Sequence, residues 1–467
     1  MQYHSTRGAA PVLGFDEVLL SGLARDGGLY VPTAWPGIAA SELRRLQGAP
    51  YLAVARRVLT PFMGGSAALP VLDRLLAEAY GSFEHRAVTP LVQLGPNLWL
   101  LELFHGPTLA FKDVALQLLG QLFERVLGER GQRVTIVGAT SGDTGSAAIE
   151  AVRDRAAVDI FMLHPRGRTS EVQRRQMTTV MSKNVTNIAV EGSFDDCQDL
   201  VKALFNDLAF RDEMRLSAVN SINWARILAQ AVYYVAAGLA LGAPDREIAY
   251  VVPTGNFGNV YAGYVAKQIG LPVGKLVVAA NRNDILQRFF ASGTMAMEGV
   301  APSLSPSMDI QVSSNFERLL FDLLDRDGAA VAKTMQDFRA SGRFTLEPAR
   351  HARALSLFEA GRLDDAGTLE EMRRVRRETG LTIDPHTAVG VAVAREKAAR
   401  LGMPTVVLAT AHPAKFPDAV EQATGQRPAL PDRLADLYRR PERMEGLANE
   451  AEALKRLIRA RIAGQNA

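Results

Sequence analysis

The feature that most constrains the fold is a repeated pairing of a short β-rich run with a following helical pattern. Alternation of this kind predicts parallel sheets whose faces are covered by helices. The sequence therefore predicts an α/β fold. The expected units are a strand at 98–104 before a helix from Lys112, one at 134–140 before a helix near 144–153, one at 248–254 before a helix at 259–269, a further strand from 273 or 275 to 280, and a closing strand at 405–410.

A chain of 467 residues is too long for one ordinary core, so two or three domains are expected. Residues 1–95 show helical patterns broken by Gly and Pro, with an amphipathic stretch at 69–80. We expect a mainly helical N-terminal region over 1–95, a smaller α/β domain over 96–220 and a larger α/β domain over 221–467. The stretch 442–462 is expected to form an amphipathic helix on the body of the protein.

The composition is that of a globular chain, with 48% hydrophobic and 22% charged residues. Lys and Arg number 53 against 50 Asp and Glu, and the charges are interspersed, so no basic field for nucleic acid is expected. The basic run at 373–377 is flanked by Glu, which is typical of a solvated helix face.

The single cysteine, Cys197, allows no intramolecular disulfide and no multi-thiolate metal site. We expect it to be a small half-buried residue, and we expect no metal. The apolar stretch at 231–241 is too short to cross a membrane, and the first residues lack the apolar region of a secretory signal. The sequence therefore predicts a cytoplasmic protein that uses neither membrane nor nucleic acid as a partner.

Lys112 is the first candidate catalytic residue. It ends the sequence His-Gly-Pro-Thr-Leu-Ala-Phe-Lys, which Asp113 follows, and it precedes a stretch that is almost entirely apolar. A helix that is apolar on most sides is buried, so the amine is expected to be desolvated beside the positive end of the helix dipole. Both effects lower the pKa of a lysine, and a neutral amine is the nucleophile that forms a Schiff base with a carbonyl. Taken alone, however, a lysine in a helix usually reaches to solvent.

Two glycine-rich loops each lie between an expected strand and an expected helix. Pro-Thr-Gly-Asn-Phe-Gly-Asn at 253–259 can turn its backbone N–H groups toward an anion, although it is neither a Walker loop nor a dinucleotide fingerprint. Ala-Thr-Ser-Gly-Asp-Thr-Gly at 139–145 offers three hydroxyl groups for a carboxylate or phosphate, although Asp143 would repel a dianion. Each loop alone is equally consistent with a tight strand–helix turn.

An imine-forming lysine, a phosphate-binding loop and a second anion loop together indicate a cofactor that carries both an aldehyde and a phosphate. Pyridoxal 5′-phosphate (PLP) is that cofactor. With these and further motifs, nearly the whole chain resembles the threonine synthase family of fold-type II, tryptophan-synthase-β-like PLP enzymes. The motifs are Tyr-His-Ser-Thr-Arg-Gly at 3–8, Leu-Ala-Arg-Asp-Gly-Gly-Leu-Tyr at 23–30, the segment 105–113, Ser-Ile-Asn-Trp-Ala-Arg at 221–226, Gly-Asn-Phe-Gly-Asn at 255–259, Ser-Ser-Asn-Phe-Glu-Arg at 313–318, Asp-Pro-His-Thr at 384–387 and Thr-Ala-His-Pro at 410–413.

The resemblance implies two parallel-sheet-based αβα domains with an N-terminal, mainly helical extension. It also implies a carbon–oxygen lyase that converts O-phospho-L-homoserine and water to L-threonine and phosphate, the last step of threonine biosynthesis. Lys112 would carry the cofactor as a Schiff base, and Thr410 would place its hydroxyl at the pyridine nitrogen. The cofactor phosphate would be held by Gly255, Asn256, Phe257, Gly258 and Asn259. The amino-acid carboxylate would meet Ser141, Gly142, Asp143 and Thr144.

The departing phosphate needs a second anion site, and Arg226 with Asn223 is the candidate because a guanidinium binds phosphate bidentately. The alternative for Arg226 is an interdomain salt bridge. In the broader superfamily Asn often stands at the position of Asp143 and contacts the 3′ oxygen of the cofactor. With Asp that contact would need a shared proton, so it stays open.

Three histidines lie in the family-like motifs, and we expect them to orient hydrogen bonds rather than to act as acids or bases. They are His105, His386 and His412. The reactive intermediates of such a reaction must be kept from water, so we expect the smaller domain to close over the cofactor.

Two other functions would use many of the same residues. A β-eliminating or β-replacing PLP enzyme, such as a serine/threonine dehydratase, would keep Lys112 and the loop at 255–259 but would not need a second phosphate site. A catalytically silent relative would only bind a phosphate ligand, which the intact lysine and loop argue against. The expected assembly is a monomer or a homodimer.

Overall fold

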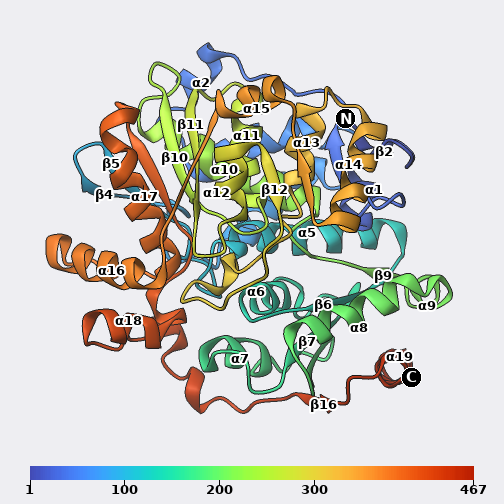
Figure 1. The fold of residues 1–467 in the computed structure, drawn as a ribbon. Coiled ribbons are helices and arrows are strands. Elements are labelled where there is room, and N and C mark those ends of the chain that lie inside the picture. Colours follow the sequence, from blue (N-terminus) through green and yellow to red (C-terminus); the bar gives the residue numbers. More distant parts are fainter. Residues whose placement is uncertain (467) are drawn as a thin grey trace.

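The computed structural model describes residues 1–466, in which parallel sheets and surrounding helices dominate (Figure 1). The strands are β1 (Gln2–Ser5), β2 (Leu13–Gly14), β3 (Tyr30–Pro32), β4 (Leu91–Gly95), β5 (Leu98–Glu102), β6 (Val134–Ala139), β7 (Val158–Pro165), β8 (Val185–Val190), β9 (Leu216–Ser217), β10 (Ile248–Pro253), β11 (Val273–Ala280), β12 (Thr294–Ala296), β13 (Arg343–Thr345), β14 (Phe358–Arg362), β15 (Thr405–Ala409) and β16 (Glu445–Leu447).

Helices separate most of these strands. They are α1 (Phe15–Ser21), α2 (Ala40–Leu46), α3 (Tyr51–Leu59), α4 (Leu72–Tyr80), α5 (Lys112–Arg130), α6 (Asp143–Val152), α7 (Glu171–Thr178), α8 (Phe194–Asn206), α9 (Leu208–Met214), α10 (Trp224–Ala240), α11 (Gly258–Gln268), α12 (Ile285–Ser292), α13 (Phe316–Leu323), α14 (Gly328–Ser341), α15 (Pro348–Leu355), α16 (Asp365–Thr379), α17 (Pro385–Leu401), α18 (Pro417–Thr424) and α19 (Ala451–Asn466). Short 3-10 turns include η3 (Pro306–Met308) and η4 (Pro413–Lys415).

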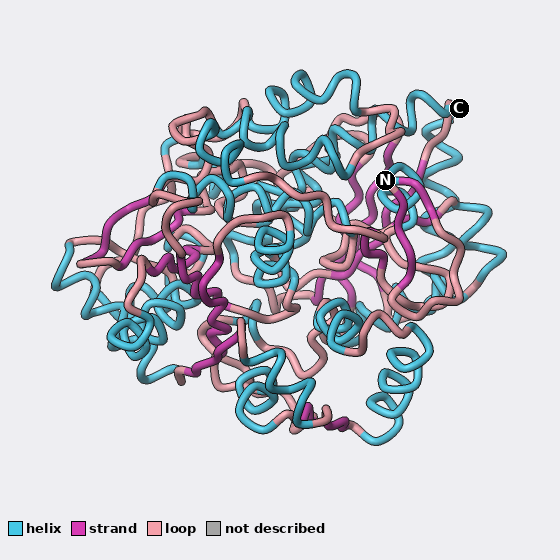
Figure 2. Tube along the Cα trace, turned by 90° about the horizontal axis from the view of Figure 1, so that it is seen from above, coloured by secondary structure: helices cyan, strands magenta, loops and turns pink. Residues whose placement is uncertain are grey.

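Two sheets form the cores of the two α/β units. One has six strands in the order β14–β11–β10–β15–β5–β4, and the other has five in the order β16–β8–β7–β6–β9. All neighbouring strands run parallel except β4 and β5, which are antiparallel. Figure 2 shows the strands gathered in separate groups, with helices around them. The predicted α/β class with two parallel-sheet-based domains is confirmed.

The six-stranded sheet is buried on both faces, as a doubly covered parallel sheet must be. Side chains alternate along β10: Tyr250 and Val252 pack into the core that includes α10 and α11. Ala249 and Val251 point the other way, into a core with Val389 of α17. This two-residue period explains why the strand reads as a continuous apolar run in the sequence.

The five-stranded sheet follows the same rule. Ile160 and Met162 of β7 belong to the core that includes α5 and α6, whereas Phe161 packs with α8 and α19. Figure 1 shows this sheet in the lower half of the molecule, with α19 at the lower right. Cys197 of α8 is 0% exposed, so the expectation of a half-buried cysteine is wrong, because its side chain faces this second core.

Three parts of the chain differ from the sequence expectations. The stretch 442–462 is not one helix: Glu445–Leu447 forms β16 on the edge of β8, and the helix begins only at Ala451. The mainly helical N-terminal region also contains a three-stranded antiparallel sheet, β2–β1–β3. Strand β5 belongs to the six-stranded sheet, although the division at residue 96 assigns it to the smaller domain. The domain limits stay a prediction. They assign β5 to the smaller domain and β16 to the larger one, whereas β5 lies in the six-stranded sheet and β16 in the five-stranded sheet.

Several loops that follow parallel strands converge at one place. The segments after β10, β15 and β6 carry the glycine-rich loop at 255–259, Thr410 and Asp143, respectively. Loops at the carboxyl ends of parallel strands are the usual position of ligand sites in such folds. Within residues 1–466 no helix has the length and apolar character needed to cross a membrane.

Candidate active site

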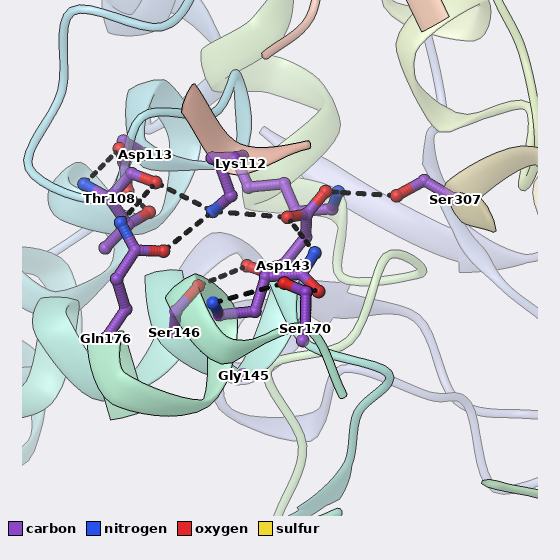
Figure 3. Close-up of polar contacts among 12 residues, drawn as sticks. Thr108, Lys112, Asp113, Asp143, Gly145, Ser146, Ser170, Gln176 and Ser307 are labelled. Carbon is purple, nitrogen blue, oxygen red and sulfur yellow. Dashed lines mark hydrogen bonds and ion pairs between the residues drawn. The ribbon is translucent and has the colours of Figure 1, made fainter. Parts of the chain in front are cut away.

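Lys112 is the first residue of α5, and its side chain is buried. Its Nζ lies 3.2 Å from Oδ2 of Asp143. Figure 3 draws the polar contacts around these two residues. Burial lowers the pKa of Lys112, Asp143 opposes this effect, and the positive charges of Lys415 and Arg226 add to it. The lysine therefore has the desolvated position and the lowered pKa that the apolar sequence after it predicts.

Asp143, at the start of α6, is the centre of the polar contacts around Lys112. One carboxylate oxygen, Oδ1, lies 2.8 Å from Nε2 of Gln173 and 3.2 Å from Nζ of Lys415. The other, Oδ2, faces Lys112 and accepts a 3.0 Å hydrogen bond from the hydroxyl of Ser307. Burial raises the pKa of this carboxyl, but Lys112 and Lys415 outweigh it and hold the pKa well below its usual range.

Lys415 is a site residue that the sequence reasoning missed. It ends η4, a few residues after β15, and its side chain is fully buried. Its Nζ donates to the carbonyl of Thr108 at 2.7 Å and to Oε1 of Gln176 at 3.1 Å, in addition to its contact with Asp143. The signal in the sequence was a lysine enclosed by prolines and an aromatic residue, Pro-Ala-Lys-Phe-Pro.

The loop at 255–259 has the geometry of an anion site. Its carbonyls are engaged, since the Ser313 hydroxyl donates to the Gly255 carbonyl at 2.7 Å and Asn315 Nδ2 donates to the Asn256 carbonyl at 2.9 Å. Phe257 adopts a left-handed conformation, with φ of 61°, at the start of α11. No acceptor within residues 1–466 takes the backbone N–H groups of residues 256–259. These groups, at a helix N-terminus, suit a phosphate.

An unpaired buried atom in this loop supports the same conclusion. The Nδ2 of Asn259 is buried and has no hydrogen-bond partner within the described chain, although Oδ1 of the same side chain accepts from the hydroxyls of Tyr233 and Tyr234. A buried donor without an acceptor is costly, so a ligand acceptor is the expected partner. The residues present therefore fit a phosphate-bearing cofactor beside Lys112.

Thr410 is tied directly to the lysine segment. It follows β15, is 5% exposed, and its carbonyl accepts the backbone N–H of Phe111 at 2.9 Å. A bridge between Ala110 and Ala411 continues this pairing. The end of β15 and the start of α5 are thus held together, which places Thr410 near Lys112.

The loop at 139–145 turns tightly into α6. The Thr140 hydroxyl accepts the N–H groups of Gly142 and Gly145, each at 2.9 Å. Gly142 has φ of 143°, a conformation that other residues rarely adopt. Ser141 is exposed and Thr144 is half-buried, so both remain at the surface of the site where a substrate carboxylate is expected.

Arg226 is completely buried in the first turn of α10. Its Nη1 donates to the carbonyl of Val219 at 3.0 Å, and its Nε has no partner within residues 1–466. It forms no ion pair in that part of the chain, so the structure does not show the interdomain salt bridge considered as its alternative. Burial lowers the pKa of this guanidinium to about 10. A buried cation without a carboxylate is the character needed for an anion site.

Asn223, the residue before α10, contacts the fold through both the oxygen and the nitrogen of its side-chain amide. Its Oδ1 caps α10 by accepting the N–H of Ala225 at 3.0 Å, and its Nδ2 donates to the carbonyl of Leu19 at 2.8 Å. The Nδ2 group carries a second N–H that these two contacts do not use. The pairing of Asn223 with Arg226 therefore stays a prediction.

The three motif histidines all lie close to other polar or aromatic side chains. Nδ1 of His386 lies 2.7 Å from Oδ2 of Asp384, and its Nε2 accepts the N–H of Ser307 at 3.3 Å. Burial lowers the pKa of His412 to about 4, and its Nδ1 accepts the N–H of Ala414 at 3.1 Å. His105 lies 2.8 Å from a carboxylate oxygen of Glu102. These contacts support an orienting role for all three.

A buried lysine at a helix start, opposite a phosphate-binding loop and between two parallel sheets, defines the fold-type II class of PLP-dependent enzymes. Residues 83–347 match the family described as pyridoxal-phosphate dependent enzyme. Residues 2–80 match the threonine synthase N terminus, and residues 387–458 match the threonine synthase C-terminal family. The chain belongs to the threonine synthase family.

Three relatives show how far this likeness extends. The threonine synthase of Pseudomonas aeruginosa is 56% identical over 98% of each chain. The crystal structure of PLP-bound threonine synthase from Brucella melitensis is 55% identical, with a TM-score of 0.96 and 99% of both chains covered. The yeast threonine synthase structure has a TM-score of 0.94 at 38% identity, again over 99% of both chains. The likeness therefore spans both α/β units and the N-terminal region.

Proposed function

We propose that the protein converts O-phospho-L-homoserine and water to L-threonine and phosphate. The observation that supports the substrate assignment is that two separate groups in the structure are suited to anions. The loop at 255–259 suits the phosphate of the cofactor, and buried Arg226 supplies a second cation for the phosphate of a substrate. A dehydratase acting on serine or threonine has no use for a second phosphate site.

The residues divide the work of binding. The N–H groups of residues 256–259 hold the cofactor phosphate, and Thr410 offers its hydroxyl to the pyridine nitrogen. The loop Ser141–Thr144 binds the substrate carboxylate. PLP, when bound, supplies the aldehyde that joins to amines and a ring that stabilises negative charge on the carbon chain of the substrate.

Lys112 moves protons on the carbon chain of the substrate as general base and acid. Its lowered pKa supports this role, because a larger fraction of the amine is uncharged and ready to accept a proton at neutral pH. Asp143 lies against the amine, and the Ser307 hydroxyl donates to the same carboxylate oxygen and so helps to fix its direction. The burial of Lys112 keeps bulk water away from the reacting carbons.

Phosphate release from O-phospho-L-homoserine tests the proposal. We expect release by the wild type and essentially none by Lys112→Ala. We expect Arg226→Gln to raise KM for the phosphoester by about 10–100-fold, since a charged hydrogen-bonding pair contributes roughly 1.5–3 kcal/mol. Turnover of serine without turnover of the phosphoester would overturn the substrate assignment in favour of a dehydratase.

Arg318→Gln is the matched control for Arg226→Gln. Arg318 is equally buried, and burial also lowers its pKa to about 10. Its nitrogens, however, are engaged by the carbonyls of Tyr30 and Ile222 and by the side chain of Asn315. This variant should lose stability without a selective rise in KM for the phosphoester.

The proposal includes a cytoplasmic location and a monomeric or homodimeric state. The single buried cysteine supports the location, because such a chain needs no oxidising compartment. Sedimentation of the holoenzyme tests the state of assembly, and a species larger than a dimer would contradict it.

A further inference from the structure

Asp143 carries a buried negative charge that needs a compensating positive charge nearby. It is a buried carboxylate whose Oδ2 lies beside Lys112, the amine that binds the cofactor. A lone buried carboxylate is costly unless a nearby cation compensates it. Lys112 cannot serve as its permanent partner, because that amine is committed to the cofactor aldehyde in the working enzyme. Another cation must therefore balance Asp143.

We propose that Lys415 is a positioning residue whose buried ammonium neutralises Asp143, so that the Asp143–Lys415 pair presents one net-neutral polar group to the cofactor. The pair would thereby offer the cofactor a polar group without net charge, as an uncharged asparagine at the position of Asp143 would. This inference rests on the assignment of PLP as the cofactor and is independent of the proposed substrate.

The contacts of Lys415 are all with oxygen acceptors. Three acceptors surround Nζ: the carbonyl of Thr108 at 2.7 Å, Oε1 of Gln176 at 3.1 Å and Oδ1 of Asp143 at 3.2 Å. An ammonium donates hydrogen bonds and accepts none, so it suits a position surrounded only by oxygen acceptors. Two of these contacts are hydrogen bonds from Nζ, and the third is an ion pair with the carboxylate of Asp143.

The two carboxylate oxygens of Asp143 contact different partners. Lys415 and Gln173 contact Oδ1, whereas Lys112 and Ser307 contact Oδ2. Lys415 can therefore stay in place when the partner of Oδ2 changes. Its own position is fixed, because its side chain is completely enclosed and it contacts the Thr108 turn, α7 and α6 at the same time.

The other charged groups near the pair already have partners or lie elsewhere. His386 acts on Asp143 electrostatically, but its ring is held by Asp384 and by the N–H of Ser307. Asp113 accepts both the N–H and the hydroxyl of Thr108, at 2.8 and 2.6 Å. Arg226 influences the pKa of Lys112 and is not among the contacts of Asp143. Lys415 also helps to lower the pKa of both Asp143 and Lys112, as a fixed positive charge should.

A double-mutant cycle on the full chain tests the pair. The variants are Lys415→Met, Asp143→Asn and the double substitution, and the measured quantities are the PLP dissociation constant, from cofactor absorbance in an equilibrium titration, and the midpoint of thermal unfolding. Each single change leaves one buried charge without its partner, so we expect PLP affinity to fall by about tenfold or more. The double variant removes both charges, and its affinity should return to within about threefold of wild type.

Lys397→Met is the matched control. The Lys397 side chain is 10% exposed, and its ion pair is with Glu396, a side chain that is 64% exposed. This variant should leave PLP affinity unchanged. Losses that simply add in the double variant would overturn the proposal. If Lys415→Met fails to fold, the double variant must fold and bind PLP, and its failure would equally refute the pair. None of these readouts needs turnover of the phosphoester, so they are separable from the substrate assignment.

Discussion

Gly255 allows a direct test of how the loop at 255–259, the proposed phosphate site, is packed. A Cβ atom at this position would lie 2.5 Å from the carbonyl oxygen of Ser307 and 3.3 Å from Cα of Met308. Ordinary contact begins at 3.4 Å, so the segment carrying Ser307 must retreat by about 0.9 Å. Both neighbours are backbone atoms, which cannot turn aside as a flexible side chain can. We therefore expect Gly255→Ala to push the loop and this segment apart.

The free-energy cost of Gly255→Ala depends on the contacts that Ser307 makes. Overpacking of this kind costs about 1–3 kcal/mol. The retreat also weakens the 3.0 Å hydrogen bond from the Ser307 hydroxyl to Asp143, and a bond to a charged group contributes roughly 1.5–3 kcal/mol. The two terms overlap because both measure the same displacement. A loss of about 2 kcal/mol in the cofactor-bound state corresponds to roughly thirtyfold weaker PLP binding.

Equilibrium titration of the apoprotein with PLP, followed by cofactor absorbance, measures this loss. Gly128→Ala is the control with the same chemistry. Gly128 lies within α5 with open space around its Cα, and alanine there should stabilise the helix by about 0.5–1 kcal/mol. Indistinguishable PLP affinity in Gly255→Ala and Gly128→Ala would show that the contact with Ser307 does not constrain the loop.

Two further predictions concern stability. Glu317, 4% exposed, accepts hydrogen bonds from Arg7 at 3.1 and 2.9 Å and from Thr6 at 2.7 Å. Glu317→Gln should therefore lower the free energy of unfolding, measured in urea, by about 3–5 kcal/mol. Glu129→Gln, in an exposed pair, should lower it by less than about 1 kcal/mol, and equal losses would contradict the role of burial. Burial raises the pKa of Asp113 from 3.8 to about 6, so the folded state binds this proton more tightly than the unfolded state. Its contribution to stability is therefore present at low pH and is lost as pH rises from about 4 to 6, by roughly 3 kcal/mol in total. The difference in unfolding free energy between wild type and Asp113→Asn should show this slope, and a pH-independent difference would refute it.

Local patterns in the sequence were enough to predict the main strands, the helix that begins at Lys112 and the two glycine-rich loops. The reason is that each depends on nearby residues: apolar runs make buried strands, and glycines make the turns that follow them. The lysine could be identified because the apolar residues after it, such as Val114 and Leu118, require burial of the whole helix. The same pattern therefore predicted both the fold class and the position of the buried lysine.

What escaped the sequence analysis depends on contacts between distant segments. Ser307 reaches Asp143 across 164 residues, and Lys415 reaches Thr108 across 307. Nothing local distinguishes Ser307 from an ordinary surface serine, and the prolines and aromatic residue around Lys415 do not show which distant groups its amine contacts. Asn223 is a further case, because its contact with the carbonyl of Leu19 spans 204 residues. Strand β16 was missed because a three-residue edge strand has too few positions to show a period.

The position of β16 has a consequence for how the polypeptide is completed during synthesis. Strands β6 to β9 leave the ribosome as one block, but β8 pairs with a neighbour on its outer side only when residues 445–447 emerge, more than 250 residues later. Until then its unsatisfied N–H and C=O groups are open to pairing with another chain. The nascent chain thus passes through a long interval of exposure to aggregation, which ends only when the last segment closes that side of the sheet.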